Sequence, residues 1–415
     1  MTPFEIEEEL KKCVKCGACM AVCPIYRQTG REDMVARGKL NLIELIKDSR
    51  ELPAGWLEAV DYCLLCCSCE ENCSKGVKIT EIIAAARVQQ TEIMGLNPIK
   101  KGVFALLKNR ILSISRFVKL GSFGQWLLWR RLPRHSGLVR RLPLPGIDEK
   151  TVIPALPKRN LDDLLRKRQT PSDLQPILFF PGCATRYLHP QMGLDLIFVL
   201  EKLGFNAIVP PEFKCCGMVT WGAGDENTSE KLREANLEVL HENTEIRQLV
   251  TGCASCGHAL KDYDGRPQNC EILDISEFLF QHREQLENLL GKRKLKQKIT
   301  YHDPCHLRKG QGVFKEPRWL LNLIAGDNFI EMRHPERCCG AGGTFGITHK
   351  ELSRKILMDK TLAADATGAG IVASGCPGCI LQLTEGAVVA DSNWQAEHPI
   401  TLSANLLRQA EPEER

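Results

Sequence analysis

The stretch CCGAGGTFG, residues 338–346, places two adjacent cysteines beside four glycines, and CCGMVTWGAGD begins in the same way at Cys215. Adjacent cysteines rarely bond to each other, because a disulfide between them strains the intervening peptide. A single metal ion seldom uses both. The repeated pair raises the question of what two neighbouring thiols hold, and the cysteines around them answer it.

These two pairs belong to a longer cysteine pattern that occurs twice in the chain. Each copy has one cysteine after an apolar run, then the CCG pair, then a C-x2-C pair, and equivalent positions lie 122 or 123 residues apart. Such a constant offset indicates an internal duplication. The first copy contains Cys183, Cys215, Cys216, Cys253 and Cys256, and the second contains Cys305, Cys338, Cys339, Cys376 and Cys379.

Both copies have the pattern of alternating strands and helices. Helical stretches such as residues 193–204 and 351–365 separate short apolar runs that suit buried parallel strands. These runs are ILFF (177–180), NAIVP (206–210), QLVTG (248–252), KITYH (298–302), NFIEMR (328–333) and GIVAS (370–374). Ligands of α/β sheets bind beyond the carboxyl ends of the strands, where the cysteines fall. We therefore expect the five cysteines of each copy to converge on one site.

The number of cysteines in each copy indicates the kind of metal group. Five thiolates exceed what one tetrahedral zinc ion takes, but they suit a multi-iron cluster in which adjacent thiolates address neighbouring irons. Glycines such as Gly217, Gly340, Gly342 and Gly343 let the backbone approach the cluster and free amide groups for its sulfurs. A phosphate-binding glycine loop is the weaker interpretation, because it leaves the cysteine register unexplained.

The first ninety residues carry a second kind of cysteine pattern, C-x2-C-x2-C-x3-C, which also occurs twice. In two-cluster ferredoxins, three thiolates of such a run bind one cubane and the fourth reaches the other. The spacing therefore predicts one [4Fe–4S] cluster on Cys13, Cys16, Cys19 and Cys73, and another on Cys63, Cys66, Cys69 and Cys23. Zinc is disfavoured, because its sites usually show two cysteine pairs rather than these quartets.

Some residues near these cysteines are not assigned to a cluster. Cys67 is expected to be a bystander thiol, and Ser74 stands where a proline usually follows the last ligand. Arg37 and Lys39 lie on a predicted helix between the two runs, and we expect them to be solvated. His258, His302 and His306 flank the duplicated cysteines. A hydrogen bond to a cluster or an ordinary loop position is favoured over ligation for them.

The totals describe an ordinary globular chain with one outlying feature. The 415 residues are 43 % hydrophobic and 26 % charged, with a net charge of +4, but they include 20 cysteines. The amino-terminal stretch shows no signal peptide, so we expect metal or redox chemistry rather than disulfides. No run of 18 uncharged apolar residues predicts a membrane-spanning helix.

A basic connector joins the two cysteine-rich regions. Residues 93–147 contain no acidic residue and interleave lysines and arginines with apolar and aromatic residues. This composition fits amphipathic helices on a membrane surface or against a partner subunit, and the sequence leaves both open. Nucleic acid is not expected, because no recognised binding motif accompanies the charge. We expect a ferredoxin-like domain at 1–95, the connector and a proline-rich linker at 96–172, and two duplicated domains at 173–291 and 292–415.

The duplicated C-xn-CCG-xm-C-x2-C pattern resembles the cysteine-rich CCG domain of heterodisulfide reductases. In that family five such cysteines bind a noncubane [4Fe–4S] cluster, which implies one or two further clusters here. The fusion behind a ferredoxin resembles the iron–sulfur subunits of glycolate oxidase, lactate utilisation systems and anaerobic glycerol-3-phosphate dehydrogenase. The implied fold is a helical two-cluster ferredoxin domain followed by two α/β CCG domains, an α+β or α/β arrangement overall.

Two functions follow from this resemblance. In the first, the protein is an electron-transfer subunit that passes electrons from a partner flavoprotein toward membrane quinone, at the inner face of the cell membrane. The chain contains no strand–GxGxxG–helix unit, so a flavin would have to come from the partner. In the second, the CCG clusters themselves reduce a disulfide. A zinc-bound scaffold or redox sensor is a weaker third interpretation.

Overall fold

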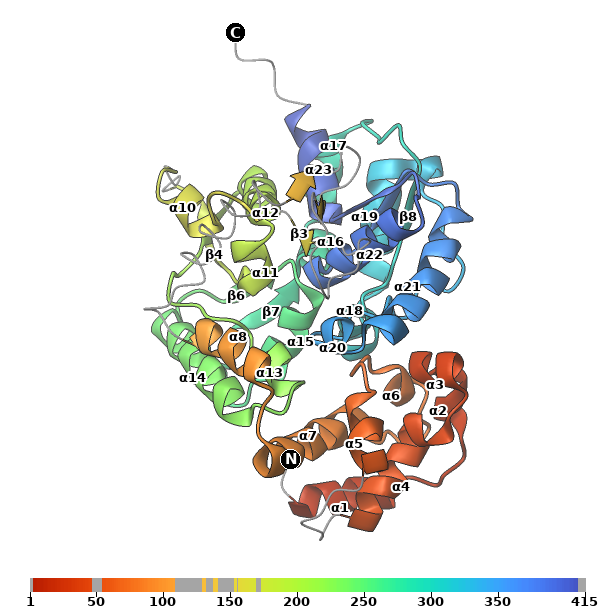
Figure 1. Ribbon diagram of the computed structural model, residues 1–415. Coiled ribbons are helices and arrows are strands. Elements are labelled where there is room, and N and C mark those ends of the chain that lie inside the picture. Colours follow the sequence, from red (N-terminus) through yellow and green to blue (C-terminus); the bar gives the residue numbers. More distant parts are fainter. Residues whose placement is uncertain are drawn as a thin grey trace.

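The computed structural model describes residues 3–46, 54–108, 129–131, 137–140, 153–154, 156–168 and 173–409, and the description below concerns these residues. A helical amino-terminal part lies below two α/β halves, which occupy the green and blue parts of the chain (Figure 1). The predicted fold class, a helical ferredoxin portion followed by a duplicated α/β region, is confirmed.

The amino-terminal part consists of short helices around a small apolar core. In α7, Ile79, Ile82, Ile83 and Ala86 are buried, and this spacing puts them on one face of the helix. Trp56 and Val60 of α5 pack into the same core. The elements are α1 (Pro3–Lys11), α2 (Ala18–Val22), α3 (Pro24–Thr29), η1 (Glu32–Met34), α4 (Ala36–Ile46), α5 (Ala54–Asp61), α6 (Ser68–Glu71) and α7 (Ile79–Met94).

The connector differs in part from the amphipathic helices expected for it. Helix α8 (Pro98–Lys108) buries Phe104 and packs against α14 of the first half, so this stretch covers the body of the protein. Further along, β1 (Trp129–Arg131), β2 (Gly137–Arg140) and β3 (Ile153–Pro154) form an antiparallel sheet instead of helix. The expectation for residues 109–128 and 141–152 lies outside the described residues. Helix α10 (Leu161–Leu165) follows, capped by the Asn160 side chain.

The first half is built on a parallel sheet with strand order β5-β4-β6-β7. Its strands β4 and β6 are buried along most of their length, as expected for a sheet covered on both faces. The strands are β4 (Gln175–Phe179), β5 (Phe205–Ile208), β6 (Gln248–Thr251) and β7 (Glu271–Asp274). The helices are α11 (Gly182–Tyr187), α12 (Pro190–Lys202), α13 (Met218–Trp221), α14 (Glu226–Glu242), α15 (Ala254–Lys261), α16 (Ile275–Gln281) and α17 (Arg283–Leu290).

The second half repeats this topology, but one of its four strands is replaced by a single β-bridge. The order β10-β9-β8 is continued by a single parallel bridge between Ile299 and Phe329, where NFIEMR was expected to form a strand. This position is the edge of the sheet, and Glu331 there is held by Arg318 at 2.8 Å. The elements are β8 (Ile299–Tyr301), α18 (Cys305–Gln311), α19 (Lys315–Ala325), η2 (Gly326–Asn328), α20 (Phe345–Thr348), α21 (Lys350–Asp365), β9 (Ile371–Ala373), α22 (Pro377–Val389), β10 (Gln395–Glu397) and α23 (Pro399–Arg408).

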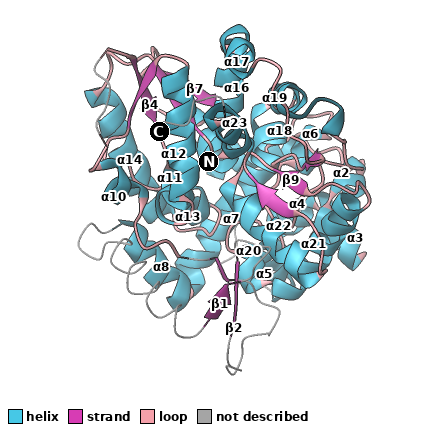
Figure 2. Ribbon diagram, turned by 90° about the horizontal axis from the view of Figure 1, so that it is seen from above, coloured by secondary structure: helices cyan, strands magenta, loops and turns pink. Residues whose placement is uncertain are grey.

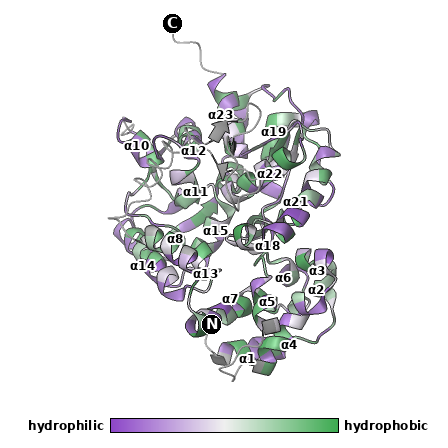
Figure 3. Ribbon diagram, in the orientation of Figure 1, coloured by the Kyte–Doolittle hydropathy of each residue, from purple (hydrophilic) through white to green (hydrophobic). Residues whose placement is uncertain are grey.

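The two halves pack on each other through reciprocal pairs of helices. Helix α12 of the first half contacts α23 of the second, and their counterparts, α19 and α16, also contact each other. In the same way α11 contacts α22, and their counterparts, α18 and α15, contact each other. One apolar core runs through both halves, and Figure 2 shows the helices around the two sheets. Helices such as α21 carry hydrophobic and hydrophilic residues on different faces (Figure 3), with Ile356, Leu357 and Ala364 buried. Among the described residues, no helix has the length and apolarity needed to cross a membrane.

Candidate metal centres

The first ferredoxin quartet lines one cavity. Cys13 and Cys16 come from the turn between α1 and α2, and Cys19 comes from α2 itself. Cys73, just after α6, completes the wall, with Cys69 beside it. Gly17 has a φ of +82° within this turn, and Arg37 donates from Nη1 to the carbonyl of Lys15 at 3.1 Å. Cys16 is exposed to solvent. The structure thus brings together the four thiols that the crossed pattern assigns to one cluster.

The second quartet surrounds a buried lysine. Cys23, Cys63, Cys66 and Cys69 lie near one another, and burial raises the pKa of the Cys23 thiol to about 11. Lys39 is 2 % exposed and donates to the carbonyl of Tyr62, so the expectation that it is solvated is wrong. Burial lowers the pKa of Lys39, while the neighbouring thiols favour its charged form. A buried cation therefore lies beside this thiol quartet.

The second quartet also reaches the second half of the duplication. The Cys66 thiol lies against those of Cys305 and Cys338. Lys309 of α18 donates to the Ser68 hydroxyl at 2.6 Å, and the His306 Nε2 lies 2.9 Å from the carbonyl oxygen of Leu65. Although burial alone would lower it, the pKa of Lys309 is raised by the thiols of Cys305, Cys66 and Cys338. The ferredoxin part and the second CCG set therefore share one boundary.

The five cysteines of the first half converge beyond the carboxyl ends of β4, β5 and β6. The Sγ atoms of Cys183 and Cys215 are 3.7 Å apart, Cys216 contacts Cys215 and Cys256, and Cys256 contacts Cys253. All but Cys183 are buried. Gly182 has a φ of +65°, and a Cβ on it would stand 2.6 Å from the Cys256 sulfur. The chain approaches this thiol so closely that only glycine fits.

The second half repeats the convergence and adds a histidine. Cys305 contacts Cys338, Cys338 contacts Cys339, and Cys339 contacts Cys379, which in turn contacts Cys376. One ring nitrogen of His302 and the sulfurs of Cys339 and Cys379 all lie within 4.8 Å of one another. His302 and Cys339 are buried, and Cys379 is half-buried. His302 therefore belongs to the site rather than to an ordinary loop.

The two CCG sites meet at the middle of the molecule. The Cys253 thiol of the first half contacts the Cys376 thiol of the second, and the N–H of Ala254 donates to the carbonyl of Gly375 at 3.2 Å. We expected one site in each half, but not this contact between them. The thiols of both halves thus form one continuous succession, which extends through Cys66 into the ferredoxin part.

The glycines after the cysteine pairs have a specific conformational role. Gly217 and Gly340 have φ angles of +78° and +88°, a region that residues with a Cβ rarely adopt. The N–H of Gly340 donates to the Sγ of Cys338 at 3.3 Å. Gly342 lets the loop approach the ferredoxin part, since a Cβ there would stand 2.5 Å from the side chain of Leu64. The double cysteine and its glycines form a tight thiol-bearing turn.

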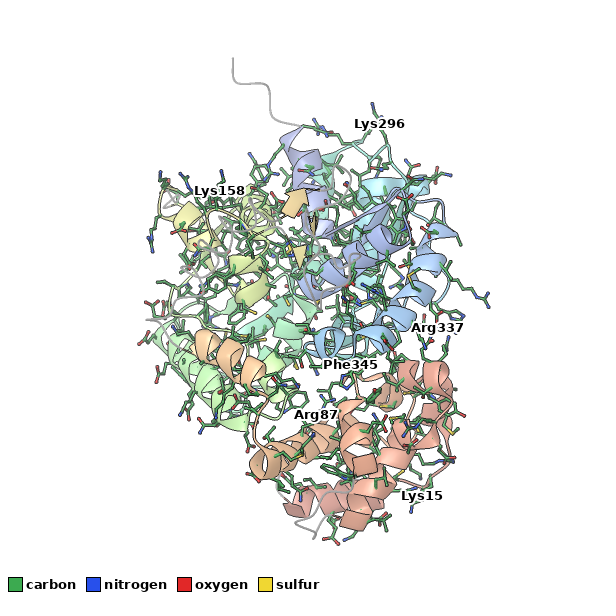
Figure 4. The ribbon with its side chains drawn as sticks, viewed as in Figure 1. Lys15, Arg87, Lys158, Lys296, Arg337 and Phe345 are labelled. Carbon is green, nitrogen blue, oxygen red and sulfur yellow. The ribbon has the colours of Figure 1, made fainter. Side chains whose placement is uncertain are left out.

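Two cations near the cysteines, one buried and one half-buried, were not predicted from the sequence. Lys360 of α21 is 3 % exposed and donates to the carbonyls of His334 and Pro335; burial lowers its pKa to about 8. Arg87 of α7 donates to the carbonyls of Cys63, at 2.7 Å, and Gly222, and it lies where the ferredoxin part meets the first half (Figure 4). The absence of acidic residues within four positions of Arg87 was a weak signal of burial. Cys67 and Cys270 are buried outside both CCG sets.

A basic cleft of about 510 Å³ leads from the surface to Cys338 between α3 and α21. Arg27, Arg333, Arg337 and Lys360 line it, against one acidic residue, Asp359, which already accepts a hydrogen bond from Gln28 at 2.7 Å. Arg337 lies at this boundary in Figure 4. The second CCG site therefore has a positively charged approach for a small molecule.

The donor sets fit iron–sulfur clusters. All twenty cysteines are free, and eighteen of them stand in the two quartets and the two five-cysteine sets. In each CCG set the neighbouring thiols shift one another's pKa values in opposite directions: contacts with Cys215 and Cys256 lower that of Cys216, whereas contacts with Cys216 and Cys253 raise that of Cys256. So many buried thiols cannot all ionise without cations, which iron supplies. The quartets have the C-x2-C-x2-C-x3-C spacing of cubane ligands.

Comparisons with known proteins match the segments that carry these cysteines. A cysteine-rich domain model matches residues 177–261 and 299–384, and a 4Fe-4S dicluster domain model matches residues 9–77. The chain is 31 % identical to the probable glycolate oxidase iron–sulfur subunit of Bacillus subtilis, over 92 % of this chain and 89 % of that one. It is 25 % identical to the glycolate oxidase iron–sulfur subunit of Escherichia coli, over 94 % of both chains.

A second group of relatives consists of heterodisulfide reductase subunits. The dihydromethanophenazine:CoB–CoM heterodisulfide reductase of Methanosarcina barkeri has a subunit that is 29 % identical, over 96 % of this chain and 94 % of that one. These relatives are subunits of oxidoreductases, and the matches run through the ferredoxin part and both CCG halves. The chain belongs to the family of the glycolate oxidase iron–sulfur subunits and is an iron–sulfur oxidoreductase subunit with an electron-transfer role.

Proposed function

We propose that the chain is the electron-transfer subunit of a membrane-associated, flavin-dependent dehydrogenase of the glycolate, lactate or glycerol-3-phosphate type. A partner flavoprotein oxidises the substrate, and this subunit passes the electrons toward quinone. It works as a cytoplasmic subunit, peripheral on the inner face of the cell membrane. The names of the glycolate oxidase relatives support the substrate class.

One observation carries this proposal: the unbroken succession of thiols. It begins at the exposed Cys16, passes the quartet around Lys39, crosses at Cys66 into the second CCG site, and crosses again at Cys376 into the first. Each group of cysteines lies against the next, so each electron-transfer step would cover only a short distance. A protein that used only one site for catalysis would not need this arrangement from end to end.

The proposed cofactors are two cubane [4Fe–4S] clusters in the ferredoxin part and a noncubane [4Fe–4S] cluster at each CCG site. This corresponds to about eight irons in the first region and up to about eight in the second. Iron and sulfide analysis of protein purified without oxygen tests the number. Stoichiometric zinc with little iron would contradict the assignment.

The flavoprotein is proposed to dock beside the first quartet. Val14 is 59 % exposed, and Lys15 lies next to it at the same cavity, so an apolar and a charged group are both offered there. The basic connector is proposed to bind the membrane surface. Replacing Arg130, Arg131, Arg140 and Arg141 with glutamate should release the complex from washed membranes. If it stays bound, the connector is a subunit interface instead.

The test of the main proposal uses Cys339→Ser in the purified complex. The variant should lose quinone reduction, because a ligand of the second CCG site is gone, while the flavoprotein still reduces an artificial dye with its own substrate. The cubane EPR signals should persist. If dye and quinone reduction fall together with the cubanes intact, or if neither changes, the second CCG site is not on the electron path.

A second candidate function is the reduction of a disulfide at the CCG sites. The basic cleft that reaches Cys338 favours it, because an anionic disulfide could enter there. Reduced methyl viologen and a carboxylate-bearing disulfide test this: oxidation of the dye by the purified chain, weakened by Arg337→Gln, would support the reductase. No oxidation beyond the protein-free rate would reject it for that class of disulfide.

A further inference from the structure

We propose that His302 supplies a nitrogen ligand to the metal group of the second CCG site, which makes its donor set different from the five cysteines of the first. The inference rests on the iron–sulfur occupancy proposed above. It concerns a residue that has no counterpart among the predicted ligands.

The backbone aims the side chain into the site. His302 directly follows β8, and its N–H donates to the carbonyl of Ala373 on the neighbouring strand at 2.9 Å, so the residue continues the sheet. The imidazole is 0 % exposed. One of its nitrogens and the sulfurs of Cys339 and Cys379 lie within 4.8 Å of one another; Cys339 stands in a loop and Cys379 in the first turn of α22. Three donors from three segments converge where one metal ion could bind.

Among the described residues, the ring makes polar contact only with thiols of the site itself, and it hydrogen-bonds to that of Cys339. Neither Nδ1 nor Nε2 of His302 has a hydrogen-bonding nitrogen or oxygen partner among the described residues. His306, only four residues away, shows the ordinary alternative: its two nitrogens lie 2.9 Å from the Ser255 hydroxyl and from the carbonyl oxygen of Leu65. Burying a ring nitrogen without a partner is costly, and the atoms close enough to serve this ring are the sulfurs of two predicted metal ligands. A bound iron would satisfy the ring.

The first half provides the matched comparison. The residue at the equivalent position is Phe180, which is also 0 % exposed and packs edge-on against Phe213, with the ring centroids 5.0 Å apart. An apolar ring therefore fills the same place in the duplicated fold. The fold does not require a histidine there, so its presence in the second half needs another reason.

A histidine ligand would change the electronic character of the second site. A neutral imidazole brings less negative charge to iron than a thiolate does, and the reduction potential of an iron–sulfur centre rises where histidine takes the place of cysteine on an iron. The second site, which adjoins the ferredoxin part, would then accept electrons more readily than an all-cysteine site.

The test is nitrogen hyperfine spectroscopy on the full chain, loaded with iron and sulfide under anaerobic conditions. With ¹⁵N-labelled histidine, the reduced CCG signal of the wild type should show the coupling of a directly bound nitrogen. His302→Phe should lose it, and His306→Gln should keep it. Phe180→His should show a second coupling, because it recreates the donor in the first site.

The outcomes separate this inference from the occupancy on which it rests. If both CCG sites hold iron and the wild type shows no bound nitrogen, or if His302→Phe keeps the coupling, His302 is not a ligand. If iron is confined to the ferredoxin part, the inference falls together with the occupancy. Should His302→Phe fail to fold, the change of the wild-type coupling between ¹⁴N and ¹⁵N histidine still decides whether an imidazole is bound.

Discussion

The two CCG halves keep the same cysteines and the same sheet order but surround them differently. Before the first cysteine, the first half has Phe179, Phe180 and Pro181, whereas the second has Tyr301, His302 and Asp303. Asp303 is 1 % exposed and accepts hydrogen bonds from Arg308 at 2.8 Å and from Arg318 at 2.9 Å. The first site is therefore enclosed by apolar rings, and the second by a buried polar network.

The location of this difference is informative. Both halves touch the ferredoxin part, but the polar half is the one whose cysteines adjoin a ferredoxin thiol, with Lys309, His306 and Cys66 at the contact. Lys360 adds a buried cation on the same side, where the first half has the neutral Asn236 behind its cysteine pair. Positive charge stabilises a reduced cluster, so the two sites are expected to have different potentials although they share a fold. Duplication preserved the ligands and let the surroundings specialise.

The largest expected effect comes from removing one cysteine of each pair in turn. Cys339→Ser should prevent electrons that enter at the ferredoxin part from reducing either CCG site. The reason is that the second site lies between the ferredoxin part and the first site. Cys216→Ser should affect only the first site. Stopped-flow spectroscopy of the iron-loaded chain, reduced by a donor that delivers electrons to the ferredoxin clusters, measures the reduction of each CCG site. If Cys216→Ser blocks reduction of the second site as well, the proposed order is wrong.

Asp274→Asn should change how stability depends on pH. Asp274 caps α16 and burial raises its pKa to about 7, although hydrogen bonds from Ser276 lower it. A carboxyl with a raised pKa in the folded protein contributes stability below its ordinary pKa of 3.8, and this contribution is lost as the pH rises through about 7. Chemical denaturation should show a loss of up to about 1.4 kcal/mol per pH unit within that range. The variant keeps a capping side chain and should lack this slope; an unchanged slope would contradict the assignment.

Gly182→Ala tests the close approach in the first half. The left-handed conformation costs a residue with a Cβ about 1–2 kcal/mol, and the Cβ would also press on the Cys256 sulfur. The midpoint temperature of thermal unfolding should fall, and iron should be lost from the first site only. Pro304→Ala is the control, because Pro304 stands at the equivalent place with an ordinary φ of −61°. Equal losses in both variants would show that the contact with Cys256 is not the cause.

Lys309→Gln should have the smallest effect, on the potential of the second site. The lysine lies among Cys305, Cys66 and Cys338, so removing its charge should make reduction there less favourable by on the order of 1 kcal/mol. A redox titration followed by EPR measures the shift. Tyr187 is at the equivalent position in the first half, and Tyr187→Phe should leave the potentials unchanged. A shift of the first site alone would contradict the placement of Lys309.

The sequence was informative wherever chemistry requires a fixed spacing. The cysteine register predicted the duplication, and the apolar runs at 177–180, 248–252 and 370–374 lie on β4, β6 and β9. Strands β7 and β10 were missed, because EILD and QAE are short and carry charged residues. The cross-contacts at Cys66 and between Cys253 and Cys376 depend on how domains pack, which no local pattern encodes. The same holds for Lys39, whose burial is decided by its neighbours.

The contact between Cys253 and Cys376 joins two residues that occupy the same position in the repeat. A residue that meets its own counterpart lies on a two-fold axis, and the exchanged helix pairs around it obey the same axis. A chain carrying only one half would therefore present a self-complementary face, and we expect it to assemble as an isologous homodimer. Because the two halves are joined in one chain, each can carry its own residue at equivalent positions, here phenylalanine at 180 and histidine at 302.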